Sequence, residues 1–98
     1  MYLVRDVFHC KPGKAKALVE KFKATLPAVE KLDPKANGRI MTDFVSTYWT
    51  VVLQMEVESM DGFENRMREW GKQPGMRAAM EGYMDLVESG HREIYRIE

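Results

Sequence analysis

The chain has 98 residues, which is enough for one hydrophobic core, and we expect a single domain over residues 1–98. Fifteen Lys and Arg residues balance fifteen Asp and Glu residues, so the net charge offers no attraction to nucleic acid or acidic lipid, and neither is predicted as a partner. The single cysteine excludes an internal disulfide, and no cluster of ligating residues predicts a zinc site, so we expect no metal and no other cofactor.

The opening segment, MYLVRDVFHC, places charges at Arg5 and Asp6 and lacks the apolar centre of a signal peptide. No apolar run approaches the roughly 20 residues of a membrane span. A lone cysteine is also typical of a reducing compartment. The sequence therefore predicts a cytoplasmic protein with no membrane partner.

Residues 2–9, YLVRDVFH, are rich in β-branched and aromatic side chains and predict the first strand. The turn KPGK follows, and apolar residues then recur at helical spacing over 15–29. Pro27 predicts a kink or a restart of this helix, with Thr25 placed to cap the restart. Residues 32–38, LDPKANG, end the helix with a proline and an Asn-Gly turn.

Two further strands are predicted at residues 39–46 and 50–58, with the short hairpin loop STYW between them. The second of these strands alternates clearly between two faces. The face predicted to join the core carries Val51, Leu53, Met55 and Val57. The opposite face carries Thr50, Val52, Gln54 and Glu56, which fits a solvated surface or a cavity wall.

A second helix is predicted to begin after Ser59, its N-cap, with Asp61 in the first turn, where a negative charge suits the helix dipole. The break GKQPG separates this helix from a further helical segment, predicted over 74–87. The motif ESG, residues 88–90, is predicted to stop that segment, and residues 91–98 are predicted to form the last strand.

The resulting order, β-α-β-β-α-β, predicts an α+β ferredoxin-like fold with a four-stranded antiparallel sheet and both helices on one face. The other face would carry Val52 and further apolar residues among polar ones, and no remaining segment is available to cover it. A second copy packed sheet to sheet would bury that face, so we predict a homodimer.

Three stretches of the sequence resemble a known family. These are the strand followed by KPGKAKALVEKF, the hairpin DFVSTYWTVVLQMEVESMDGFE and the ending MDLVESGHREIYRIE. Together they resemble the dimeric α/β-barrel superfamily, above all its antibiotic biosynthesis monooxygenase-like and NIPSNAP-like branches. The resemblance implies that two sheets close into a barrel in the dimer, with a ligand cavity between sheet and helices or inside the barrel.

The superfamily includes cofactor-free monooxygenases, haem-degrading enzymes, isomerase-like lactone enzymes and many members with no known reaction. Its haem-degrading members use a histidine on a helix. Neither His9 nor His91 is predicted on a helix, so the resemblance disfavours haem degradation here.

The turn KPGK contains one glycine and ends in GKA, so it fits a strand-to-helix turn better than a phosphate-binding loop. Cys10, at the end of the first strand, is predicted to be a small buried apolar residue rather than a nucleophile. In an antiparallel pairing of the first and last strands, His9 and His91 would lie close together, with Glu93 on the same face as His91. A metal site would need a third ligand, which Glu93 could supply, but two histidines in 98 residues can easily lie together by coincidence, so we interpret both as exposed strand-end residues.

Polar side chains on predicted strands are the best indication of a site, because a buried charge is costly unless it is paired. They are Arg5, Asp6, Asp43, Gln54, Glu56, Arg92 and Arg96. Two interpretations remain open: an ion-pair network between subunits, or a polar pocket for a small organic acid, an aromatic molecule or a polyketide-like molecule. Tyr48 and Trp49, in the hairpin loop, are expected at the dimer interface or at the entrance of a cavity.

Three functions follow as alternatives: a dimer that binds a small organic ligand, a cofactor-independent monooxygenase or isomerase-like enzyme, and a structural or protein-binding dimer module. An enzyme of the second kind would hold an electron-rich substrate in a cavity with Arg5, Asp6, Tyr48 and Trp49, and its candidate catalytic residues are His9 and Asp6. The candidate ligand-binding residues are Arg5, Tyr48, Trp49, Gln54, Glu56, His91 and Arg92.

Overall fold

The computed structural model describes residues 1–98 and contains a single four-stranded sheet. Its strands are β1 (Tyr2–Cys10), β2 (Arg39–Thr42), β3 (Thr50–Val57) and β4 (Val87–Arg96). The helices are α1 (Ala15–Leu32), α2 (Met60–Lys72), the short α3 (Met76–Met80) and a 3₁₀ turn, η1 (Tyr83–Leu86). The strand order is β2-β3-β1-β4 with every neighbour antiparallel, which confirms the predicted ferredoxin-like arrangement. None of these helices is both long enough and apolar enough to cross a membrane.

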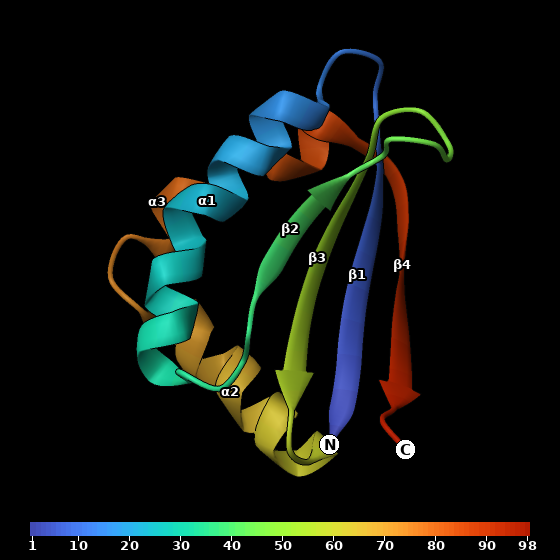
Figure 1. The fold of residues 1–98 in the computed structure, drawn as a ribbon. Helices are drawn as coiled ribbons and strands as arrows, with labels where there is room; N and C mark the ends of the chain where they lie inside the picture. Colours follow the sequence, from blue (N-terminus) through green and yellow to red (C-terminus); the bar gives the residue numbers. More distant parts are fainter.

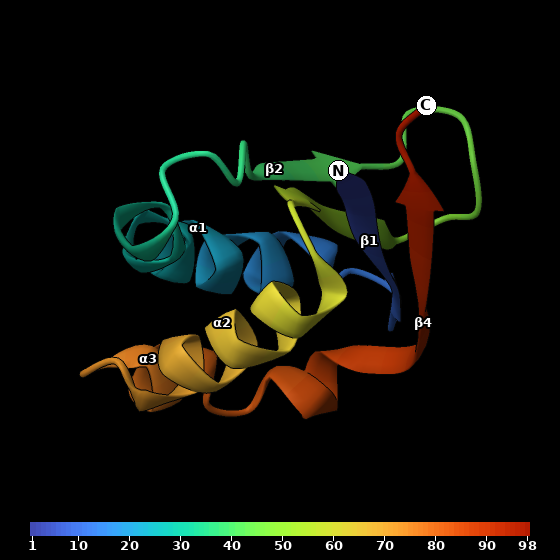
Figure 2. The same cartoon turned by 90° about the horizontal axis from the view of Figure 1, so that it is seen from below.

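All the helices lie on one side of the sheet (Figure 1). The view from below shows the same two layers, with α1, α2 and α3 together on one side of the four strands (Figure 2). We call the helix-covered side of the sheet the inner face and the opposite side the outer face. The predicted coverage of one face only is therefore confirmed.

The core lies between the inner face and the helices. Around the first half of α1, Leu18 and Phe22 pack against Val51 of β3. Towards the other end, Phe63 and Trp70 of α2 join a second cluster that includes Val4, Val29, Met55 and Val57. Leu18 and Val51 are completely inaccessible to solvent. The apolar faces predicted for the first helix and for this strand therefore pack against each other.

The local turn chemistry follows the sequence closely. Gly13 adopts a left-handed backbone with φ of 77°, which suits the turn between β1 and α1. Asn37, in the predicted Asn-Gly turn, has a φ of 49°. The Ser59 hydroxyl accepts a hydrogen bond from the Gly62 amide at 3.0 Å, so Ser59 is the N-cap of α2 as predicted.

The predicted restart at Pro27 is wrong, because α1 is one helix of 18 residues that continues through this proline. Thr25 is not a cap either. Its hydroxyl is buried and donates to the carbonyl of Phe22 at 3.2 Å, within the helix. Both halves of α1 bury apolar residues against the sheet, Phe22 before the proline and Val29 after it, and this packing outweighs the hydrogen bond that Pro27 cannot make.

The predicted second strand is also too long. β2 ends at Thr42, and residues 43–49 form the loop to β3. The Asp43 carboxylate accepts the backbone N–H of Thr50 at 2.9 Å, a donor that a continued ladder would pair with a backbone carbonyl. In Figure 1 this β2–β3 loop projects beyond β4, away from the helices.

The prediction of one helical segment over 74–87 is wrong, and so is the stop at 88–90. α3 ends at Met80, and Gly82, with a φ of 80°, starts the 3₁₀ turn instead. Glu88, Ser89 and Gly90 belong to β4. A side chain at position 90 would approach the Val7 carbonyl to 2.9 Å, so this glycine is needed for strand pairing rather than for helix termination.

Candidate functional site

The register of the strands arranges the outer-face side chains in rows across the sheet. The central row runs from β2 to β4 through Met41, Val52, Val7 and His91. The next row, towards the N-terminus of β1, runs through Arg39, Gln54, Arg5 and Glu93. We call these the apolar row and the charged row. The outer face therefore combines a band of apolar atoms with a line of charged and amide groups.

Glu93 is the centre of the polar contacts on the outer face. Its carboxylate lies 3.0 Å from Nε2 of His91, accepts the Tyr95 hydroxyl at 3.2 Å and lies 3.8 Å from the Arg5 guanidinium. The hydrogen bond from His91 is the main cause of a Glu93 pKa below its usual range, with smaller contributions from Tyr95 and Arg5. The carboxylate is therefore ionised at neutral pH, and it is fixed in position by three residues.

His9 and His91 lie side by side as the strand pairing predicts, with ring centroids 5.9 Å apart. His9 lies on the side of Thr50, whose Oγ1 is 3.3 Å from the His9 Nδ1, while His91 pairs with Glu93. No group of three His, Cys, Asp or Glu side chains is arranged to hold a metal ion.

Asp6 and Arg92 lie on the inner face, away from the other charged candidates. Arg92 binds Asp6 through two hydrogen bonds, from Nε at 2.6 Å and from Nη2 at 3.2 Å. The same guanidinium lies over the ring of Phe63 in α2, 5.1 Å from its centroid. This arrangement ties the edge strand β4 to β1 and to the helical layer, so it acts as a structural clamp.

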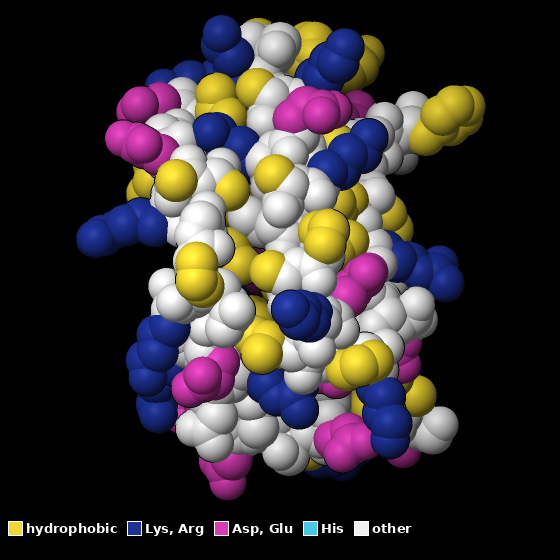
Figure 3. Space-filling view, turned by 90° about the vertical axis from the view of Figure 1, so that its left-hand side faces the viewer, with side chains coloured by type: hydrophobic (Ala, Val, Ile, Leu, Met, Phe, Trp, Pro, Cys, Tyr) yellow, Lys and Arg dark blue, Asp and Glu magenta, His cyan; other side chains and the backbone are white.

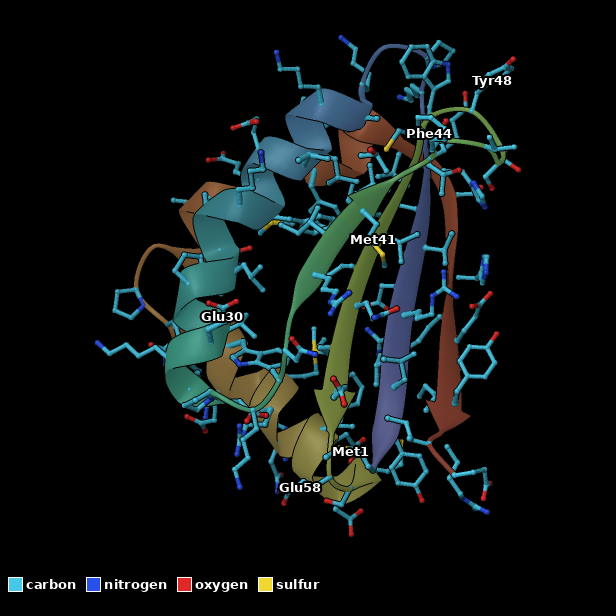
Figure 4. All side chains as sticks on the ribbon, viewed as in Figure 1. Met1, Glu30, Met41, Phe44, Tyr48 and Glu58 are labelled. Carbon is cyan, nitrogen blue, oxygen red and sulfur yellow. The ribbon has the colours of Figure 1, made fainter.

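The clearest pocket lined by predicted site residues lies between the first turns of α1 and the β2–β3 loop. It has a volume of about 520 Å³. Tyr48 and Trp49 come from the loop, Ala15 and Val19 come from α1, and the charged residues of the lining are Lys16, Glu20, Lys23 and Asp43. Figure 4 shows Phe44 and Tyr48 at the end of the loop, beyond the sheet. A pocket of this volume matches small-molecule sites in size.

Trp49 is held in an unusual backbone conformation within this pocket. Its φ is 61°, in the left-handed region that bulky residues rarely adopt. The Trp49 carbonyl accepts the backbone N–H of Cys10 at 2.8 Å, which fixes the loop against the end of β1. Backbone strain of this kind clusters at ligand sites, where the surrounding structure maintains it.

Two other hollows are weaker candidates for a binding site than the pocket beside the β2–β3 loop. One, of about 380 Å³, lies at the start of α2, where Arg66 and Asp33 already form an ion pair at 2.8 Å. The other, of about 720 Å³, lies along α3 and η1 and is lined by none of the predicted site residues. Figure 3 shows the helix side of the molecule, where side chains of both charge signs are mixed, with scattered apolar atoms between them. This face therefore has no patch of one charge sign.

The structure divides the sequence-predicted site residues into three groups. Arg5, His9, Gln54, Glu56 and His91 share the outer face, Asp6 and Arg92 pair on the inner face, and Tyr48 and Trp49 line the pocket. The cavity expected from Arg5, Asp6, Tyr48 and Trp49 together is therefore not formed, because adjacent residues of β1 point to opposite faces.

Cys10 is buried among the core residues at the end of β1, which confirms its predicted structural role. Burial raises the pKa of the Cys10 thiol, so the reactive thiolate is disfavoured. The α1 side of the pocket, including Lys16 and Lys23, was not predicted from the sequence. Their spacing of seven residues, which places two lysines on one helix face, was the available signal.

No protein-family model matches the sequence, and no curated protein matches it. Solved structures do match the fold. An uncharacterised NIPSNAP domain protein from Burkholderia xenovorans has a TM-score of 0.81 and 12% identity, over 100% of this chain and 95% of that one. A NIPSNAP family protein from Agrobacterium tumefaciens has a TM-score of 0.81 and 13% identity, over 99% of this chain and 92% of that one.

A candidate antibiotic biosynthesis monooxygenase from Deinococcus radiodurans is similar as well, with a TM-score of 0.71 and 14% identity, over 100% of this chain and 93% of that one. At these identities the likeness concerns the fold. The chain thus has the ferredoxin-like fold that NIPSNAP proteins and proteins assigned as antibiotic biosynthesis monooxygenases share.

Proposed function

We propose that this chain forms a homodimer through its outer faces and binds a small aromatic carboxylate in the pocket between α1 and the β2–β3 loop. The observation that carries the binding function is the pocket itself. It joins two loop aromatics to two lysines, Lys16 and Lys23, in a volume suited to a small molecule.

The chemistry of the lining supports the class of ligand. Tyr48 and Trp49 offer flat apolar surfaces for stacking, and Ala15 and Val19 add aliphatic contacts. Neither lysine takes part in an ion pair within the chain, whereas the Asp43 carboxylate is engaged by the Thr50 amide. A planar molecule with one carboxylate would stack on the aromatics and place its charge near the lysines.

The outer face and the β2–β3 loop support the dimer. Phe44, Val45 and Tyr48 of the loop are 100%, 89% and 81% exposed, an unusual concentration of large apolar side chains in water. The loop projects beyond the outer side of the sheet (Figure 1), so a second copy packed on that side would bury these side chains together with the apolar row. No helix of the same chain is available for this purpose.

Binding, rather than a stated reaction, is the function that the geometry supports. The Deinococcus neighbour is a candidate monooxygenase, and such chemistry would need a proton acceptor beside the substrate. The two residues considered for that role in this chain are separated, because His9 projects from the outer face and Asp6 is paired with Arg92 on the inner face. We therefore propose a class of ligand for this chain without a reaction.

A fluorescence titration with 2-naphthoate tests the binding proposal. The chain has two tryptophans, Trp49 in the pocket and Trp70 buried in the core, so the ligand is expected to change the emission of Trp49 alone. Trp49→Phe should abolish the signal while calorimetry still detects binding. A response that survives Trp49→Phe would place the ligand elsewhere.

The charge preference is tested with the double variant Lys16→Gln/Lys23→Gln. We expect its affinity for 2-naphthoate to fall by roughly threefold to tenfold, as expected for exposed ion pairs. Lys31→Gln, at the other end of α1, is the matched control and should bind normally. Equal binding of naphthalene-2-methanol and 2-naphthoate would contradict the anionic ligand, and no binding of either would leave a dimer module without a ligand function.

A further inference from the structure

We infer that the ligand of the pocket between α1 and the β2–β3 loop is a free aromatic α-amino acid, whose ammonium group is bound by Glu20 and Asp43 while its carboxylate is bound by the two lysines. The ligand is thus the aromatic carboxylate proposed above with a second charged group, and its identification rests on that proposed function. The acidic part of the lining carries the inference, because a simple carboxylate leaves it without a partner.

The charged side chains of the pocket are balanced in sign. They are Lys16, Glu20, Lys23 and Asp43. None of the four takes part in an ion pair within the chain. The pocket therefore offers two cationic and two anionic groups, and a ligand that carries one charge of each sign complements it better than an anion does.

Three of these charges alternate along one face of α1. Steps of four and then three residues separate Lys16, Glu20 and Lys23, so their side chains follow one another along about 10 Å of helix. Glu20 thus lies between the two lysines that would bind the carboxylate. A ligand with a carboxylate alone brings its negative charge beside Glu20, and like charges at such a separation repel each other.

Asp43 adds a second carboxylate from the loop side of the pocket. Its Oδ1 accepts the Thr50 amide at 2.9 Å, and its own amide donates to the Thr50 carbonyl at 3.1 Å. These two hydrogen bonds fix Asp43 at the start of the loop and leave its Oδ2 available to a ligand. An ammonium group between Glu20 and Asp43 would receive charged acceptors from both sides and would offset their repulsion of the ligand carboxylate.

Tyr48 and Trp49 define the rest of the ligand. They line the same pocket and offer flat surfaces on which an aromatic ring stacks. In an α-amino acid both charged groups are borne by one carbon atom, so they reach the alternating charges of α1 together. A peptide does not present this pattern, because its first residue lacks a free carboxylate and its last residue lacks a free ammonium group.

A role for Glu20 in α1 alone is the competing explanation, in which it only pairs with a lysine on the helix surface. Glu20 and Lys23 have the same spacing and order as Glu69 and Lys72 of α2, and the α2 pair is formed at 3.9 Å. The Glu20–Lys23 pair is not formed. Beside the pocket, the two charges therefore remain available to a ligand.

Three ligands that share one carbon skeleton test the inference by calorimetry at neutral pH. L-Phenylalanine carries both charged groups, 3-phenylpropanoate lacks the ammonium group, and 2-phenylethylamine lacks the carboxylate. We expect phenylalanine to bind at least about threefold more tightly than either of the others, as expected when exposed ion pairs are added.

The double variant Glu20→Gln/Asp43→Asn tests whether the two acids cause this preference. Asp43→Asn keeps a side-chain oxygen for the Thr50 amide, so the loop should remain in place. The dissociation constants of phenylalanine and 3-phenylpropanoate should become equal in this variant. Glu30→Gln is the matched control, because it removes an exposed carboxylate at the end of α1 away from Tyr48 (Figure 4), and it should leave the preference unchanged.

The outcomes separate this inference from the proposed function. If 2-naphthoate binds and phenylalanine binds no better than 3-phenylpropanoate, the amino acid is overturned and the aromatic carboxylate stands. A preference for phenylalanine that survives Glu20→Gln/Asp43→Asn, or 2-phenylethylamine that binds as tightly as phenylalanine, would also overturn the amino acid. No binding of 2-naphthoate or of any of the three ligands would overturn both.

Discussion

The two faces of the sheet use the same four strands in different ways. On the inner face, Val4, Val51 and Met55 are almost completely buried under the helices. On the outer face, Val7 and Val52 are 8% and 9% exposed, although no helix covers this face. Hydrophobic burial by the chain itself thus accounts for one face. The apolar and charged rows on the other face are the surface through which we propose that the chain dimerises.

Val51 and Val52 provide a matched pair, because they are neighbours in β3 that point to opposite faces. We expect Val51→Ala to lower the free energy of unfolding by about 1.5–3 kcal/mol at every protein concentration, since it removes a buried part of the core. Val52→Ala should instead weaken the dimer, so its effect in urea unfolding should grow as the protein is diluted. The same concentration dependence for both variants would remove the distinction between the faces.

The Arg92–Asp6 pair tests whether the inner face also secures the edge strand. Replacement Arg92→Met keeps much of the aliphatic contact and removes both hydrogen bonds, which leaves the half-buried Asp6 carboxylate unpaired. We expect a loss of about 1–3 kcal/mol in urea unfolding, because hydrogen bonds to charged groups are of that order. Arg96→Met, on the same strand and without an ion pair, should change stability by less than about 0.5 kcal/mol.

Glu93 should give the outer face a measurable acid sensitivity. Its pKa is lower in the folded chain than its ordinary value of about 4.5, so it contributes stability above that value and loses the contribution as the pH falls through the folded-state pKa. Glu93→Gln should therefore lower the melting temperature at neutral pH, with the difference shrinking below pH 4.5. Glu30→Gln, which removes an exposed carboxylate of α1, is the control, and an unchanged difference between pH 7 and pH 3 would contradict the prediction.

The sequence was sufficient for the arrangement of strands and helices because periodicity and caps are local signals. The alternation of β3 and the Ser59 cap both appear as predicted. The signals failed where tertiary contacts outweigh local preference. Pro27 lies inside a helix that both of its halves bury, and Gly90 lies in β4 because it packs closely on β1.

The candidate site was predictable only in part. The proximity of His9 and His91 was predictable, because it depends on the regular pairing of two strands. The pocket depends on the left-handed backbone conformation of Trp49 and on a loop that starts at Asp43. Neither feature produces a recognisable sequence pattern. Strand alternation alone predicts that Asp6 and Arg5 lie on opposite faces of the sheet. It does not say which of these faces the helices cover, and the structure supplies that.

The central claim is that the outer face is buried against a second copy, and sedimentation velocity tests it most directly. The original protein should sediment at about twice its chain mass of 11.4 kDa. Val52→Glu, which places a charge in the apolar row, should sediment as a monomer with an unchanged far-ultraviolet circular dichroism spectrum. An original protein that sediments as a monomer at high micromolar concentration, or a folded Val52→Glu variant that remains a dimer, would contradict the account.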